Sequence, residues 1–339
     1  MSSRLRRTSL TLSTAFGLML ALAACGGSTT PSSSTSAPTS AAPTTSAPVP
    51  APSPTEPTTP AAGPITIGAF GFGESKILAH LYAVALTSVG YEPTVVELTN
   101  REVVEPALEA GEVQVVPEYL GTFTEFLNLK INGPDATPLA SGDVEATLAA
   151  LKPLAESVGI TVLTPSPAVD QNAFAVTKEF ADANGLVTIS DLAEYSKNNP
   201  VVLGGPPECP ERPFCQPGLE KTYGLNVGEF VALDAGGPLT KAALQQGEIE
   251  VGLIFSSDGA IDANKLVVLV DDKALQTADN VIAAVNTAAY SPALQEALDA
   301  LAAALTTADL IALNKSVDID RVDPEVAARE WLAAKGLFQ

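Results

Sequence analysis

The feature that most limits what this chain can fold into is an alternation of short apolar strands with amphipathic helices, which begins at residue 65. A strand is expected over 65–70, followed by a helix in which apolar residues recur every three or four positions until Gly90. Further strands are expected over 94–98, 113–116 and 160–163, each preceded by helical sequence. Such alternation is typical of α/β layers, so we predict an α/β fold with largely parallel sheets.

The strand and helix pattern starts again near residue 169. Strands are expected over 169–176, 201–204, 231–233, 251–255, 266–270 and 281–285. Alanine-rich helices with leucines at helical spacing then close the chain. The region from Pro64 to Gln339 is therefore long enough for two lobes of ordinary size.

Residues 1–25 have the pattern of an export signal. Three arginines come first, and a mostly apolar run over 11–24 follows that is too short to span a bilayer. The run ends in Leu-Ala-Ala-Cys25-Gly, which resembles the bacterial lipobox, where small residues precede a cysteine that becomes lipid-modified. We therefore expect a lipid anchor at Cys25. The alternative is an ordinary secretory signal with a chance cysteine.

Residues 26–63 consist almost entirely of Ser, Thr, Pro, Ala and Gly. This composition supplies no core and favours extended, polyproline-like chain, so we predict a disordered linker. At roughly 3 Å per residue, the linker could hold a folded domain up to ~100 Å from a membrane anchor.

The formal net charge is −21, and removal of the leader would take away three arginines and no acidic residue. Strong negative charge disfavours nucleic acid and anionic membrane surfaces as partners. The single histidine, His80, falls within a helix as a face residue. Without a second histidine, neither a histidine-based catalytic triad nor a histidine-rich metal site is supported, and we expect no cofactor and no metal.

The stretch Pro206–Gly224 is rich in prolines and holds the only cysteines outside the leader, Cys209 and Cys215. It also carries Glu208 and Arg212, four residues apart. No histidine lies nearby to complete a zinc site, and the cysteine spacing is wider than in a Cys-Xaa-Xaa-Cys redox motif. We therefore predict a structural disulfide that encloses Arg212 and restricts the backbone that aims this side chain.

Three turns follow strand ends in the first half of the chain, at 70–74, 98–101 and 117–122. Ligands bind at the carboxyl ends of the strands in open α/β sheets, so we expect these turns to lie along one edge. Gly71 and Gly73 do not form a phosphate loop, because neither a Lys-Ser/Thr pair nor a third glycine follows in the required position.

A series of short motifs, in the same order along the chain, resembles the substrate-binding proteins of ABC importers for osmoprotectants such as glycine betaine, choline and carnitine. The matching segments are Val116–Thr122, Asn172–Ala175, Glu208–Arg212, Pro217–Gly224, Phe255–Gly259, Leu313–Val317 and Pro324–Ala327. The resemblance implies a type II periplasmic-binding-protein fold, in which two lobes flank a ligand cleft and two crossover segments join them. Lobe I would comprise 64–166 and 261–339, and lobe II would comprise 167–260.

The resemblance also implies roles for individual side chains. Tyr119, Phe174 and Phe255 would form an aromatic cage for a quaternary ammonium. Thr122 and Arg212 would hold a carboxylate. Further roles fall to Glu208, which would orient Arg212 or face the cation, and to Asn172, which would line the mouth.

The chain departs from the family pattern at the cage. Phe174 and Phe255 stand where the family has tyrosine, and Phe70 stands where it has lysine. The turn over 277–280 carries no aromatic residue, although the family has a tyrosine there. We hypothesise that Phe70 restores the missing aromatic face.

Taken together, these patterns predict a monomeric, lipid-anchored solute-binding protein on the extracytoplasmic side of the membrane, whose partners are a small ligand and the permease of an ABC importer. The alternative is a sensing or wall-associated binding protein for another small zwitterion or amino acid, without transport. An enzyme ranks third, because the sequence offers no nucleophile–base pair and no metal cluster.

Overall fold

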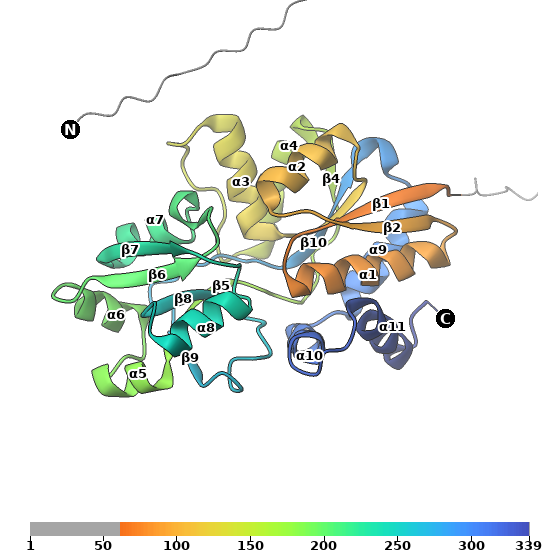
Figure 1. Ribbon diagram of the computed structural model, residues 1–339. Helices are drawn as coiled ribbons and strands as arrows, with labels where there is room; N and C mark the ends of the chain where they lie inside the picture. The colour runs from red at the N-terminus through yellow and green to blue at the C-terminus, as the bar shows by residue number, and fades with distance from the viewer. Residues whose placement is uncertain (1–61, 339) are drawn as a thin grey trace, which may run out of the picture. The chain divides into compact units, whose positions relative to one another are not determined.

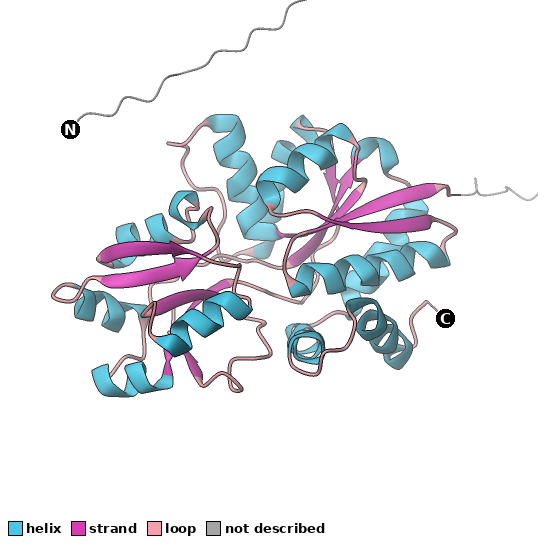
Figure 2. Ribbon diagram, in the orientation of Figure 1, coloured by secondary structure: helices cyan, strands magenta, loops and turns pink. Residues whose placement is uncertain are grey.

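The computed structural model describes residues 62–338. The predicted signal peptide, the lipid anchor at Cys25 and nearly all of the predicted linker lie outside these residues. Two five-stranded sheets with accompanying helices organise the described region. Figures 1 and 2 show how these helices and strands are arranged. Between residues 62 and 338, no helix is both long and apolar enough to cross a bilayer.

The first sheet defines lobe I and has the strand order β2-β1-β3-β10-β4. Its strands are β1 (Pro64–Ala69), β2 (Glu92–Glu97), β3 (Val115–Tyr119), β4 (Ile160–Val162) and β10 (Val281–Asn286). The helices of this lobe are α1 (Gly73–Ser88), α2 (Arg101–Ala110), α3 (Leu120–Asn132), α4 (Val144–Ser157), α9 (Pro292–Ala304), α10 (Thr307–Asp318) and α11 (Pro324–Lys335), with a 3₁₀ turn η3 (Thr287–Ala289). Every residue of β3 and β10 is buried, as expected for central strands covered on both faces.

The second sheet defines lobe II and has the order β7-β6-β8-β5-β9. Its strands are β5 (Asn172–Thr177), β6 (Val201–Gly205), β7 (Val227–Ala232), β8 (Val251–Phe255) and β9 (Leu266–Val268). Its helical elements are α5 (Lys178–Asn184), α6 (Ile189–Ser196), η1 (Cys209–Glu211), α7 (Gln216–Gly218), η2 (Leu219–Tyr223) and α8 (Pro238–Gln246). The α/β class and the two-lobed fold are thus confirmed.

The sheets are mixed, and the prediction of largely parallel sheets was wrong. Among the eight strand pairings in residues 62–338, four are antiparallel, and all four involve β5 or β10. These two strands are the first that the chain enters after each passage between the lobes. They therefore begin at the edge where the parallel strands end, and they run in the opposite direction.

The predicted boundary at residue 260 also needs correction. Strand β9 pairs antiparallel with β5, as in the contact of Leu266 with Thr177, so it belongs to the second sheet. The chain returns to lobe I between Val268 and Val281, later than expected. The sequence over 251–260 contains β8 and the turn after it, which does not leave lobe II. The next strand, β9, forms the edge of the same sheet.

Each lobe has an apolar core of its own. Helix α1 is central to the core of lobe I, where it contacts β1, β2, α9 and α11. Trp331 of α11 packs against this core and donates a hydrogen bond from its indole nitrogen to Asp309. The core of lobe II includes Cys209 and Cys215, so both ends of the disulfide loop are packed into the lobe.

Candidate functional site

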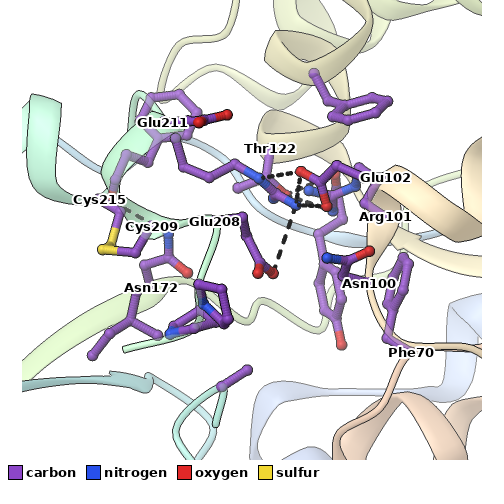
Figure 3. A pocket seen from close by; sticks show the side chains of 18 of the residues that line it. Phe70, Asn100, Arg101, Glu102, Thr122, Asn172, Glu208, Cys209, Glu211 and Cys215 are labelled. Carbon is purple, nitrogen blue, oxygen red and sulfur yellow. Dashed lines mark hydrogen bonds and ion pairs between the residues drawn. A yellow bond between two sulfur atoms is a disulfide. The ribbon is translucent and has the colours of Figure 1, made fainter. Parts of the chain in front are cut away.

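A cavity of about 670 Å³ lies where the strand ends of both sheets meet. From lobe I it is lined by the three turns that follow β1, β2 and β3, which confirms that these turns share one edge. From lobe II it is lined by the starts or ends of β5, β6, β7 and β8. Figure 3 shows the cavity, with Glu208 and the Cys209–Cys215 disulfide on one side and Asn100, Arg101 and Glu102 on the other.

Three aromatic rings in the cavity wall form what we call the aromatic group, namely Phe72, Tyr119 and Phe255. The ring centroid of Phe72 lies 5.1 Å from that of Phe255 and 6.3 Å from that of Tyr119. Phe72 belongs to the turn after β1, Tyr119 ends β3, and Phe255 ends β8, so both lobes contribute. The group thus places aromatic rings from both lobes in the cavity wall.

Phe70 lines the cavity, but it lies behind the aromatic group. Its ring stacks on Phe72 with centroids 5.9 Å apart, and only 3% of the residue is exposed. The guanidinium carbon of Arg101 lies 5.6 Å from the centroid of the same ring. Phe70 therefore supports Phe72, which is the better placed of the two to face a ligand.

Phe174 does not line this cavity, which contradicts its expected place in the aromatic cage. It is 1% exposed and belongs to the core of lobe II. Strand β5 begins at the cavity with Asn172, so Phe174 lies two residues deeper on the same strand. Alternate residues of a strand share a face, so the side chains of Phe174 and Asn172 lie on the same face of the sheet. Phe174 is farther from the cavity, and its ring is covered by the core of lobe II.

Tyr119 is held by a buried polar network that also joins the two lobes. Its hydroxyl donates a hydrogen bond of 2.8 Å to Glu74 at the start of α1. The other carboxylate oxygen of Glu74 accepts hydrogen bonds from Ser257 of lobe II and from Asn314 of α10. Burial raises the pKa of Glu74 and raises that of the nearby Asp170 well above its ordinary value. The ring of Tyr119 is thus fixed by its hydroxyl.

Arg212 reaches across the cavity to lobe I. Its Nε and Nη2 donate hydrogen bonds of 2.8–3.0 Å to the carboxylate of Glu102 in the first turn of α2. Glu208 is farther away, with its Oε1 3.9 Å from Nη2. Burial and the charge of Arg101 lower the pKa of Arg212, while the two carboxylates oppose this shift. Glu102, more than the predicted Glu208, orients the guanidinium.

The predicted disulfide between Cys209 and Cys215 is present and encloses Arg212. Within the loop, Arg212 donates its backbone N–H to the carbonyl of Cys209, and Cys215 donates to the carbonyl of Arg212. The 3₁₀ turn η1 fills the first half of the loop. These contacts fix the backbone from which the Arg212 side chain extends.

Thr122 lines the cavity and makes polar contacts with two neighbouring residues. Its hydroxyl accepts a hydrogen bond of 3.1 Å from Nη2 of Arg101, and its backbone N–H donates one of 2.9 Å to Asp279. Asp279 lies between β9 and β10, in the turn where the family resemblance implies an aromatic residue. Thr122 therefore links the cavity wall to a crossover segment.

Asn172, the first residue of β5, lines the cavity. It pairs with Phe255 across strands β5 and β8, and its amide nitrogen donates a hydrogen bond of 3.3 Å to the carbonyl of Phe214. Phe214 also accepts from the amide of Gln276. The disulfide loop is thereby tied to the start of β5 and to the second crossover segment.

The cavity wall carries more acidic than basic side chains. The acidic residues are Glu102, Glu125, Asp170, Glu208, Glu211, Asp234 and Asp279, and the basic ones are Arg101, Lys130 and Arg212. Each of the three cations has an acidic partner in the structure. Within residues 62–338, no group of three or more His, Cys, Asp or Glu side chains is arranged to hold a metal ion.

Several lining residues were not among those predicted from the sequence, and Phe72, Arg101, Glu102 and Phe126 are four of them. Phe72, Arg101 and Glu102 lie in or next to the strand-end turns at 70–74 and 98–101, so the position of the turns was a usable signal. Phe126 lies within α3. The guanidinium carbons of Arg101 and Arg212 lie 6.0 and 5.9 Å from the centroid of its ring. No local pattern marks a residue in the second turn of a helix as part of a cavity.

Comparison with known proteins places these features in context. A family model described as the substrate binding domain of an ABC-type glycine betaine transport system matches residues 63–334. The chain is 28% identical over 287 residues to the glycine betaine-binding protein YehZ of Escherichia coli (strain K12), an alignment that covers 81% of this chain and 92% of that protein.

Two further matches agree. A glycine-betaine-binding protein of Pseudomonas aeruginosa is 28% identical over 279 residues, with 79% of this chain and 86% of that protein covered. A solved structure described as a glycine betaine/carnitine/choline ABC transporter has a TM-score of 0.62 and 27% identity, and the match covers 81% of this chain and all of that one.

Proposed function

Because the chain belongs to the family of substrate-binding domains of ABC-type glycine betaine transport systems, we propose that it captures a small osmoprotectant and delivers it to an ABC importer. The ligand is a quaternary amine or a zwitterion such as glycine betaine. As a member of this family, the chain is a binding protein and not an enzyme. The cavity between the lobes receives the ligand.

The observation that carries this proposal is the aromatic group of Phe72, Tyr119 and Phe255, with Phe72 and Phe255 5.1 Å apart. A methylated ammonium cannot donate hydrogen bonds, so it gains most from aromatic faces, each worth roughly 0.5–2 kcal/mol to a desolvated cation. The acidic cavity wall adds a favourable field for a positive charge.

Arg212 is the partner for a ligand carboxylate in this proposal. Arg101 is paired with Glu118 at 2.7 Å, and both side chains are buried, whereas the Arg212 side chain is 23% exposed at the cavity. A guanidinium can hold a carboxylate through two parallel hydrogen bonds. Glycine betaine would then lie with its ammonium at the aromatic group and its carboxylate toward lobe II.

We also propose that the chain is exported and held at the membrane by a lipid. Residues 1–25 direct export, Cys25 carries the lipid, and residues 26–63 separate the folded region from the membrane surface, where it acts as a monomer. The variant Cys25→Ala should move the protein from the membrane fraction to the soluble extracytoplasmic fraction. Retention of the variant in the membrane fraction would contradict lipid anchoring.

Isothermal titration calorimetry tests the binding function directly, with glycine betaine, choline, carnitine, ectoine and proline as ligands. We expect saturable 1:1 binding of at least one quaternary amine. The variant Arg212→Ala should lower the affinity for glycine betaine by about tenfold or more, because a charge-assisted bidentate contact is lost. The affinity for choline should change much less. Arg329→Ala, on an exposed ion pair of α11, is the matched control. No response to any of the five ligands would overturn the proposal.

A further inference from the structure

The ion pair between Arg212 and Glu102 connects the two lobes. Among the ion pairs formed within residues 62–338, it is the one that joins lobe I to lobe II across the cavity. Glu102 belongs to the first turn of α2, and Arg212 belongs to the disulfide loop. Both residues line the cavity, so the pair lies in the space that a ligand must enter.

Glu102 takes the edge of the guanidinium that a carboxylate ligand needs. Its Oε1 accepts from Nε at 3.0 Å and from Nη2 at 2.8 Å, and its Oε2 accepts from Nη2 at 3.0 Å. This is the bidentate mode in which an arginine holds any carboxylate. A ligand carboxylate that binds the same edge must displace Glu102.

The two partners differ in their freedom to move. The Glu102 side chain is 42% exposed, so its carboxylate can turn into water at small cost. Arg212 is 23% exposed, its backbone is fixed by the disulfide, and the ring of Phe126 lies 5.9 Å from its guanidinium. In an exchange of partners, Glu102 leaves and Arg212 stays.

The other cavity cations cannot take over the carboxylate. Arg101 is held by Glu118 through two hydrogen bonds in a buried pair. Lys130 is held by Glu105 and Glu109, each at 2.7 Å. A cation without a carboxylate, such as choline, needs no free guanidinium and can bind while Glu102 remains on Arg212.

We propose that Glu102 competes with the ligand carboxylate for Arg212 and thereby sets the preference of the cleft between zwitterionic and purely cationic quaternary amines. This inference rests on the proposed binding function. It makes Glu102 a specificity-determining residue of lobe I that acts on a carboxylate-binding residue of lobe II.

The variant Glu102→Gln tests the inference by calorimetry with glycine betaine and choline. Glutamine keeps the size and one acceptor oxygen of the side chain but loses the charge that competes for Arg212. We expect glycine betaine to bind roughly two- to fivefold more tightly, as for removal of a partly exposed ion pair, and choline to bind no more tightly than before. The selectivity ratio between the two ligands therefore shifts toward glycine betaine.

Glu211→Gln is the matched control, because Glu211 also lines the cavity but forms no ion pair with Arg212 in the described residues. It removes the same charge from the same wall. If the overall charge of the wall alone governs binding, both variants change the affinities for the two ligands to the same extent, and the inference is wrong. If Glu102 instead acts as a latch that holds the lobes together, Glu102→Gln weakens both ligands, which also overturns it.

The experiment separates this inference from the binding function beneath it. Binding of glycine betaine to the wild-type protein without a gain in Glu102→Gln rejects the competition and leaves the function intact. Absence of binding to the wild type and to Glu102→Gln, for both ligands, rejects the function and the inference together.

Discussion

Arg101, a residue of the cavity wall, donates two hydrogen bonds to Glu118, at 2.8 and 2.7 Å. The side chains are only 6% and 2% exposed. The pair supports two lining residues, because Arg101 also donates to Thr122 and lies over the ring of Phe70. The ion pair therefore shapes the cavity wall, and the charge of Arg101 is neutralised by Glu118.

Loss of the Glu118 charge should strongly destabilise the protein. In Glu118→Gln the buried guanidinium loses its counter-ion, and breaking a buried pair in this way costs about 3 kcal/mol or more of unfolding free energy. The double variant Arg101→Met with Glu118→Met should cost less than the sum of the single changes, because no unpaired charge remains buried. Guanidinium chloride unfolding measures all three variants. Additive losses would show that the pair carries no coupling.

Asp279 should make stability depend on pH. Burial raises its pKa to about 6 in the folded protein, against an ordinary value of 3.8. The folded state therefore holds this proton more tightly than the unfolded state, so the contribution of Asp279 to stability falls as the pH rises from about 4 through 6. The pKa difference corresponds to a change on the order of 2–3 kcal/mol.

The variant Asp279→Asn isolates this effect, because it removes the titration and keeps an acceptor for the backbone N–H of Thr122. Its melting temperature should change less than that of the wild type between pH 4 and pH 7. Asp320→Asn, at an exposed ion pair with Lys315, serves as the control and should follow the wild type. Parallel curves for wild type and Asp279→Asn would refute the assignment.

Phe72 should contribute to binding through its aromatic face. Phe72→Ala removes the ring between Tyr119 and Phe255 and should weaken a quaternary amine by about 3- to 30-fold, the range expected for one desolvated cation–π contact. Phe72→Leu keeps the apolar volume without the π-face and should lose nearly as much affinity. Titration of choline and glycine betaine measures both losses. Full affinity in Phe72→Leu would mean that apolar contact alone suffices.

The disulfide should matter more to the ligand carboxylate than to the fold. Replacing Cys209 and Cys215 by serine frees the backbone around Arg212 and removes about 2 kcal/mol of chain-entropy stabilisation. Glycine betaine affinity should fall several-fold, and choline affinity should change little. Calorimetry before and after reduction of the wild type gives an independent measurement. An equal loss for both ligands would point to general loosening of lobe II.

Much of the fold follows from local sequence signals. The strand β8 occupies the predicted range 251–255, because an apolar run bounded by polar residues is decided by neighbouring residues. The direction and pairing of strands are not local. The antiparallel course of β5 and β10 and the place of β9 in lobe II depend on where the chain crosses between the sheets.

The site was predictable at its strand-end turns and less so elsewhere. Tyr119 and Thr122 lie at the cavity because they stand where the parallel strand β3 ends and α3 begins. Phe174 was misplaced, since a motif match does not tell how far a strand runs from the edge before a side chain enters the core. The contact of Glu102 with Arg212 joins residues 110 positions apart, beyond any local pattern.

A crystal structure with bound glycine betaine tests the central claim most directly. We predict electron density for the trimethylammonium group against the rings of Phe72, Tyr119 and Phe255, and for the carboxylate within hydrogen-bond distance of the Arg212 guanidinium. Density for the ligand outside this cavity, or with its ammonium group away from these three rings, would contradict the account.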